Sequence, residues 1–150
     1  MTSVANIVEN EFRRCLLAHI GQNPGYRVWA QNVGKVPVRN NSGRTLSVFD
    51  AGPPDGAADI TGILIPEGTR IELELKGPRT PVRPAQLRWE EHMVNMGAVY
   101  VRYRIDAKRS LEENLDRVAH ELDVAIEVKR RGVIESKNCD CVTCMSMVRS

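Results

Sequence analysis

GAADITGILIPEGTRIELELKG, residues 56–77, is the stretch of sequence that decides the fold. It holds two apolar runs, residues 60–65 and 70–75, joined by Pro66-Glu67-Gly68, which is typical of a hairpin turn. The second run alternates, so its side chains divide between the two faces of a strand: Ile71, Leu73 and Leu75 on one, and Glu72, Glu74 and Lys76 on the other. The stretch therefore predicts two antiparallel strands, with a charged row along the second.

Two carboxylates and one ammonium group are expected to meet at the open end of this hairpin. Asp59 begins the first strand, and Glu74 and Lys76 lie near the end of the second. Antiparallel pairing brings the start of one strand beside the end of the other, so Asp59 is expected near Glu74. Residues two apart on a strand share a face, with Cα atoms roughly 6.5–7 Å apart. The alternative interpretation is a solvated strand face with weak charge pairs, which is common for Glu-x-Lys.

The residue types at this point suit the hydrolysis of a phosphodiester bond. Mg²⁺ binds one or two carboxylates and keeps several water and phosphate oxygens as its other ligands. Such a metal polarises a scissile phosphate and lowers the pKa of a bound water. Lys76 would orient that water or offset negative charge on the phosphorane.

The flanking sequence predicts helices and further strands. Residues 4–20 form an amphipathic pattern that Gly21 and the Asn23-Pro24-Gly25 turn end. Strands are expected over residues 26–31 and 44–49, with residues 32–43 as a hairpin-like excursion or a mobile loop between them. Pro84 opens a helix that Gly97 ends, and a strand follows over residues 98–104.

The last part of the chain predicts a second long helix. Ser110-Leu111-Glu112-Glu113 is a capping box, and residues 123–135 either continue the helix that it opens or turn into a strand. The order helix, strands, helix, strand, helix predicts an α/β or α+β fold in which helices flank a mixed β-sheet.

This ordered set of motifs resembles the VRR-NUC domain of the PD-(D/E)XK nuclease superfamily, in its small stand-alone phage or bacterial type. The resemblance rests on GAADITGIL (56–64), GTRIELELKG (68–77), Gln86 on the following helix and MGAVYVRY (96–103), with YRVWAQNVG (26–34) upstream. It covers roughly residues 4–106. The resemblance implies a restriction-endonuclease-like core, which we assign to residues 1–135, followed by a cysteine-containing tail over residues 136–150.

The resemblance also implies roles for individual residues. Asp59 and Glu74 match the metal-binding acids, with the backbone carbonyl of Leu75 as a further ligand. Lys76 matches the catalytic lysine, and Gln86 matches the helical glutamine that supports the site or touches the substrate. The family also uses a glutamate of the first helix to assist the metal.

That helical glutamate is expected to be Glu9, because its spacing from Phe12 and Leu16 keeps it near the inward stripe, whereas Glu11 falls on the far side. The sequence departs from the family at Ala58, where the family has proline before the catalytic aspartate. A literal Pro-Asp occurs at Pro54-Asp55, but no strand follows it, so Asp59 is preferred.

These assignments predict an Mg²⁺- or Mn²⁺-dependent endonuclease on branched or duplex DNA. Residues 79 and 83 flank the loop after the catalytic strand and residues 35 and 44 lie upstream, so the expected phosphate contacts are Arg79, Arg83, Lys35 and Arg44. Small stand-alone members resemble Holliday-junction resolvases, and a two-fold junction suits a homodimer. The alternatives are a non-catalytic DNA-binding module of the same fold, and a restriction-like or exonucleolytic enzyme acting on linear DNA.

Composition limits the remaining possibilities. The chain has 150 residues, of which 42% are hydrophobic and 27% charged, as in one globular domain, and its net charge of +2 does not itself indicate nucleic acid. No apolar run reaches a membrane span and the N-terminus lacks a signal-peptide pattern, so we expect a cytoplasmic protein, in the host cytoplasm if it is phage-encoded.

Three of the four cysteines crowd the tail, at Cys139, Cys141 and Cys144. They are interpreted either as reduced thiols or as a zinc site. Zinc would need a fourth ligand, from Cys15, His19, His120 or a second protomer.

Overall fold

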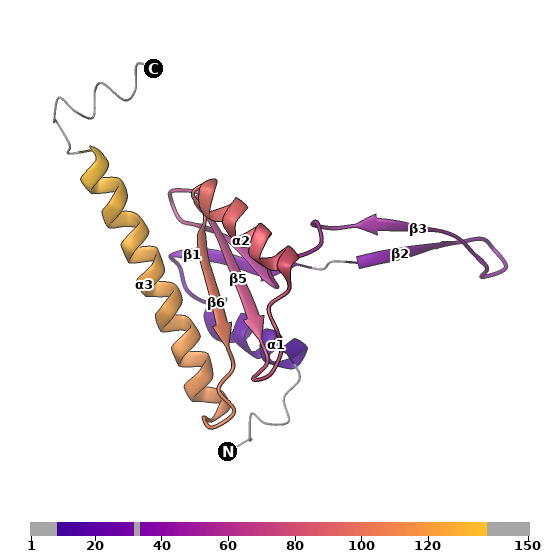
Figure 1. Cartoon of the computed structure of the whole chain (residues 1–150), viewed down its shortest axis with the longest axis horizontal. Coiled ribbons are helices and arrows are strands. Elements are labelled where there is room, and N and C mark those ends of the chain that lie inside the picture. Colours follow the sequence, from indigo (N-terminus) through magenta and orange to yellow (C-terminus); the bar gives the residue numbers. More distant parts are fainter. Residues whose placement is uncertain (1–8, 32–33, 138–150) are drawn as a thin grey trace.

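The computed structural model describes residues 9–31 and 34–137 and shows a mixed α/β chain. Its elements, in chain order, are α1 (Glu9–Ile20), β1 (Tyr26–Ala30), β2 (Gly34–Arg39), β3 (Thr45–Ala51), β4 (Ile60–Leu64), β5 (Arg70–Lys76), α2 (Pro84–Asn95), β6 (Val99–Arg104) and α3 (Leu111–Lys137). Four strands form a mixed sheet in the order β1-β4-β5-β6, and β2 and β3 form a separate two-stranded sheet (Figure 1).

The sheet changes from antiparallel to parallel at β5. β4 pairs with both β1 and β5 in antiparallel fashion, whereas β5 pairs with β6 in parallel. The parallel pair needs a crossover, and α2 supplies it between β5 and β6. Gly97 follows α2 with φ of +88°, the left-handed conformation that ends a helix at little cost in glycine.

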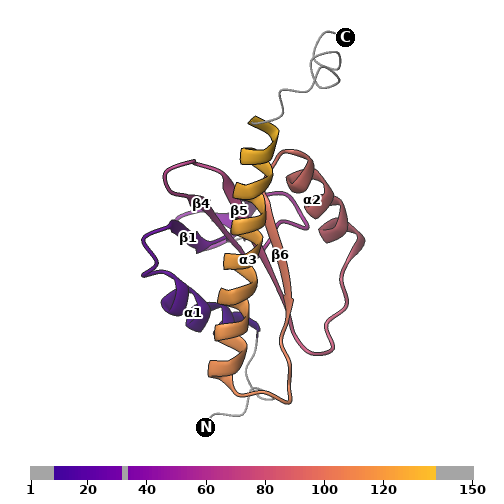
Figure 2. The same cartoon turned by 90° about the vertical axis from the view of Figure 1, so that its left-hand side faces the viewer.

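Helices lie on both faces of the sheet. α3 lies across one face, and α2 lies against the other, toward the β6 edge (Figures 1 and 2). The apolar core lies on the α3 side, where α1 also packs, and includes Phe12, Leu16, Ile60, Leu73, Leu75, Val101, Val118 and Leu122. The apolar face predicted for residues 71–75 is therefore the core face.

Most predicted elements are confirmed within one or two residues. The strands predicted at residues 26–31, 60–65, 70–75 and 98–104 correspond to β1, β4, β5 and β6. The segment after Leu122 continues as helix, and α3 ends at Lys137, two residues beyond the boundary expected for the tail. Residues 4–8 of the first predicted helix lie outside the described residues.

The excursion between β1 and β4 is a hairpin that projects from the body as an arm of β2 and β3 (Figure 1). A strand, β2, forms where a mobile loop was the alternative, and β3 begins one residue later and ends two residues later than predicted. The apolar side chains of this arm are exposed: Val36, Val38, Leu46, Val48 and Phe49. Among the described residues, no helix has the length and apolar character needed to cross a membrane.

Candidate active site

The charged row of β5 is buried, which excludes a solvated strand face. Glu72, Glu74 and Lys76 expose 0%, 1% and 4% of their surface. They lie on the sheet face that α2 covers, and α2 contributes hydrogen-bonding side chains to two of them. Charged groups are removed from water only at a high cost unless partners compensate. Such an arrangement in an α/β protein marks a candidate functional site.

Glu74 is held by a lysine and a glutamine. The Nζ atom of Lys76 lies 3.0 Å from Oε1 of Glu74, and Nε2 of Gln86 donates a hydrogen bond to the same oxygen. Lys76 shares the strand face with Glu74, and Gln86 comes from the first turn of α2. The amide oxygen of Gln86 accepts from the Arg83 backbone N–H at 2.9 Å, which fixes the glutamine itself.

Asp59 lies at the same end of the sheet. Its Oδ2 accepts a hydrogen bond from the backbone N–H of Leu75 at 2.8 Å. Ile60 pairs with Leu73, so the same antiparallel register sets Asp59 opposite Glu74. The backbone carbonyl of Asp59 accepts from Gln31 N–H at 2.9 Å, which extends the β1–β4 pairing by one step. The structure thus brings Asp59, Glu74 and Lys76 together.

Glu9 reaches the site from α1. Its Oε1 accepts a hydrogen bond from the backbone N–H of Gly77 at 2.6 Å, directly after β5, whereas Glu11 is exposed. A Cβ atom at Gly77 would lie 3.0 Å from this carboxylate oxygen and 2.8 Å from Oγ1 of Thr80. Glycine at position 77 therefore permits the close approach of Glu9, a role that the sequence analysis missed.

Burial raises the pKa values of the two central acids, and a neighbouring carboxylate adds to this effect at each of them. Burial, followed by the negative charge of Asp59, raises the pKa of Glu74 to about 7, against the lowering effect of Lys76 and Arg102. Burial also raises the pKa of Asp59, although the Leu75 N–H, Arg13 and Lys76 oppose it. A cation between these acids would favour their ionised forms.

A metal ion fits these residues, as one oxygen of Glu74 shows. Oε2 of Glu74 is buried and has no hydrogen-bond partner in the described part of the chain. An orphaned carboxylate oxygen is costly, and a cation would compensate it. Asp59, Glu74 and the Leu75 carbonyl would provide hard oxygen ligands for Mg²⁺ or Mn²⁺.

The set of protein oxygen ligands for this metal is small. Within residues 9–31 and 34–137 no cluster of three or more His, Cys, Asp and Glu side chains is arranged to hold a metal. Two protein carboxylates suit Mg²⁺, which keeps most of its ligands as water and phosphate, and suit a closed structural zinc site poorly.

A second buried acid, Glu72, was not singled out as a site residue. Its carboxylate accepts hydrogen bonds from Thr61 Oγ1 at 2.9 Å, Trp89 Nε1 at 2.8 Å, Arg70 Nε at 2.5 Å and Gln31 Nε2 at 3.3 Å. These donors come from β4, β5, α2 and the residue directly after β1, so the carboxylate joins four parts of the fold. The alternation that marks Glu74 also marks Glu72, but only the fold shows its partners.

Two other residues near the site were missed. Arg13, which lowers the pKa of Asp59, lies four residues after Glu9, and that helical spacing was the available signal. Gly56 has φ of +93°, and a Cβ there would lie 2.3 Å from the carbonyl oxygen of Ala85. The turn before Asp59 is therefore packed directly against the start of α2, beside Gln86.

The expected DNA-contacting residues are divided between two places. Arg79 and Arg83 are exposed on the loop from β5 to α2, and Arg83 pairs with exposed Asp55 at 3.2 Å. Arg44 is exposed in the turn between β2 and β3, on the arm that projects from the body (Figure 1). The backbone of Lys35 lies in β2, and its side chain lies outside what the structure describes.

Other predicted ligands are not brought to the site. Asp55, the rival to Asp59, is ion-paired with Arg83 at the surface. Cys139, Cys141 and Cys144 lie outside the described residues. Of the expected fourth zinc ligands, His19 instead lies 3.1 Å from Asp116.

No protein-family model and no curated protein matches the chain. The resemblance to VRR-NUC nucleases therefore stays a prediction.

Proposed function

We propose that this protein is an Mg²⁺- or Mn²⁺-dependent DNA endonuclease with a VRR-NUC-like, restriction-endonuclease-like core. The observation that carries the proposal is the buried Glu74 carboxylate, which is paired with Lys76, set beside Asp59, and left with one unpartnered oxygen. Two acids and a lysine at the end of a mixed sheet are groups that suit metal-assisted phosphodiester hydrolysis.

The residues of the chain have distinct parts in this proposal. Asp59 and Glu74 would hold the metal, which when bound supplies Lewis-acid activation of the phosphate and of water. Gln86 and the Leu75 N–H fix these two carboxylates before any ligand arrives. Lys76 places a positive charge next to Glu74, where it can orient the attacking water or offset charge on the phosphate.

Glu9 acts on the end of β5. By binding the Gly77 N–H, it fixes the chain immediately after Lys76, and its negative charge raises the pKa of Asp59. Both effects connect α1 to the metal-binding acids. Glu9 is therefore proposed as an assisting residue of the metal site.

The DNA would reach the site from the side of the loop that carries Arg79 and Arg83. Both arginines are exposed, and phosphate contacts of this kind give affinity without sequence preference. The proposal includes branched, Holliday-junction-like DNA as the preferred substrate. It also includes a homodimer, which the exposed apolar residues of the β2–β3 arm support as a contact surface.

Cleavage of labelled DNA tests the proposal. A four-way junction, a linear duplex and a single strand are each incubated with the protein in Mg²⁺, Mn²⁺ or EDTA. We expect metal-dependent cleavage, strongest on the junction, that Glu74→Ala lowers at least a hundredfold. The matched control is Glu91→Ala, which removes an exposed acid of α2 and should cleave as the parent does.

Each other outcome has a definite meaning. If Glu74→Ala cleaves as well as the parent, the assignment of the active site is wrong. If the parent binds DNA and never cuts it in either metal, the protein is a DNA-binding module. If only linear DNA is cut, the restriction-like or exonucleolytic alternative holds.

A further inference from the structure

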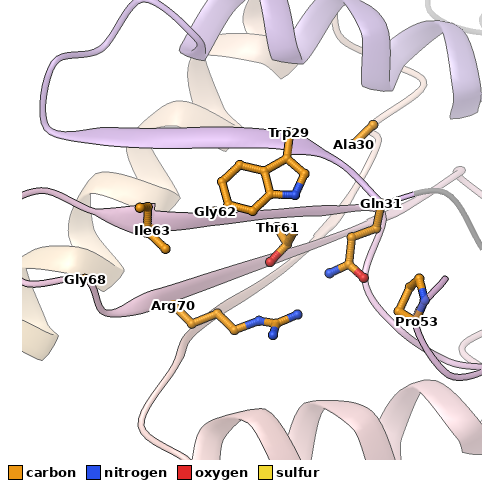
Figure 3. A pocket seen from close by; sticks show the side chains of 9 residues that line it. All are labelled: Trp29, Ala30, Gln31, Pro53, Thr61, Gly62, Ile63, Gly68 and Arg70. Atoms are coloured by element: carbon orange, nitrogen blue, oxygen red, sulfur yellow. The ribbon is translucent and has the colours of Figure 1, made fainter.

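A pocket of about 580 Å³ opens on the sheet face beside the Glu72 cluster. Its walls include Trp29 of β1 and Gln31 directly after it, Thr61 of β4, Arg70 of β5, and Pro53 of the loop between β3 and β4 (Figure 3). α2 covers the β5–β6 side of this face, and the pocket lies on the β1–β4 side, which none of the described helices covers (Figures 1 and 3). The pocket therefore lies on the same sheet face as Glu74.

The side chains of the pocket combine a flat aromatic surface with fixed polar groups. Trp29 exposes 49% of its surface, although tryptophan is usually buried in a domain of this size. Gln31 and Thr61 are buried and hydrogen-bonded to Glu72, so their positions are set before a ligand binds. Figure 3 shows Trp29 and Arg70 on either side of Thr61.

Arg70 is oriented by two contacts. Its Nε lies 2.5 Å from Oε1 of Glu72, and its guanidinium carbon lies 5.9 Å from the centre of the Trp89 ring. The side chain is still 46% exposed. A guanidinium that is held through Nε and remains accessible suits a phosphate or the polar edge of a base.

The pocket lies close to the proposed catalytic row. Trp29 is opposite Thr61, and Thr61 is opposite Glu72, so these three form one row across the sheet. Gln31, Asp59 and Glu74 form the row two residues further along, at roughly 6.5–7 Å. This separation is about two stacked nucleotides at 3.4 Å each.

We propose that this pocket binds an unpaired base of the DNA substrate, next to the scissile phosphate, with the base stacked on Trp29. Gln31 and Arg70 contact the base edge or the adjoining phosphate. The inference rests on the proposed nuclease function and adds a reason for structural selectivity. A base inside an intact duplex cannot reach a pocket, whereas a base at a branch point or in a single strand can.

Binding without cleavage tests the pocket. The full chain is titrated with a twelve-residue oligothymidylate and with a blunt duplex of equal length in EDTA, and binding is followed by fluorescence anisotropy of the labelled DNA. Stacking on one aromatic residue predicts that Trp29→Ala weakens binding of the single strand roughly 5- to 150-fold. Duplex binding should change less than about twofold. Val128→Ala, which truncates an exposed apolar residue of α3, is the matched control.

A spectroscopic readout separates stacking from a structural effect. Oligothymidylate should quench the tryptophan fluorescence of the parent. Trp29→Phe should retain most of the affinity for the single strand and lose this quenching, because the only other tryptophan of the sequence is Trp89, whose ring N–H donates to Glu72. Unchanged single-strand affinity in Trp29→Ala, or an equal loss on duplex, would overturn the inference. Glu74-dependent cleavage with no effect of Trp29 refutes the pocket alone. Trp29-dependent binding without any cleavage refutes the nuclease alone.

Discussion

Replacing Glu74 with glutamine should change how the stability of the protein depends on pH. The side chain keeps its shape, and its amide oxygen can still accept from Gln86 and Lys76, but it no longer ionises. In the parent, burial and the neighbouring Asp59 raise the pKa of Glu74 from 4.5 to about 7. Between these values the unfolded chain releases a proton that the folded chain retains, so stability falls as the pH rises.

The expected size of this effect follows from the two pKa values. At about 1.36 kcal/mol per pH unit, the difference corresponds to roughly 3 kcal/mol. This part of the stability is fully present below pH 4.5 and is lost above pH 7. Asp59 also has a raised pKa and titrates in both proteins, so the difference between parent and Glu74→Gln reports Glu74 together with its interaction with Asp59.

Urea unfolding followed by circular dichroism measures the effect. In EDTA, the free energy of unfolding of the parent relative to Glu74→Gln should fall by roughly 3 kcal/mol between pH 4.5 and 8. Saturating Mg²⁺ should restore most of this loss at pH 8 in the parent and little in the variant, because the metal binds the ionised carboxylate. A difference between the two proteins that stays constant with pH would refute the buried, proton-retaining carboxylate on which the metal site is argued.

Two further predictions concern the support of the site and the path of the DNA. Gly56→Ala should lower the free energy of unfolding by about 2–4 kcal/mol, because Gly56 combines a positive φ with a contact to the Ala85 carbonyl. The control is Gly43→Ala, at a positive φ in open space, which should lower it by only about 1 kcal/mol. Equal losses of the two variants in urea unfolding would contradict the packing of Gly56 against Ala85. Replacing Arg79 and Arg83 together with alanine should weaken DNA binding at every sequence and reduce the slope of log K against log salt by about 2, with exposed Arg131→Ala of α3 as the control. An unchanged slope would mean that the DNA does not cross this loop.

Local spacing was enough to place the central residues of the site. The alternation over residues 70–76 sets Glu74 and Lys76 on one strand face, and the short hairpin sets Asp59 opposite Glu74. The helical period selected Glu9 over Glu11, and the structure places Glu9 against the end of β5. These inferences succeed because the strand repeat and the helix repeat are properties of a few consecutive residues.

Only the tertiary structure decided what surrounds these residues. Alternation defines a charged face of β5 but does not predict that α2 covers it. The burial of Glu72, Glu74 and Lys76 and the raised pKa of Glu74 could therefore not be predicted from the sequence. The donors to Glu72 come from β4, β5, α2 and the residue after β1, and Gly56 of the turn before β4 packs against Ala85 of α2. The sequence determined which side chains share a face, because that depends on local backbone geometry. The fold decided their burial and their partners, because these depend on segments that are distant along the chain and meet only when the sheet and its helices pack.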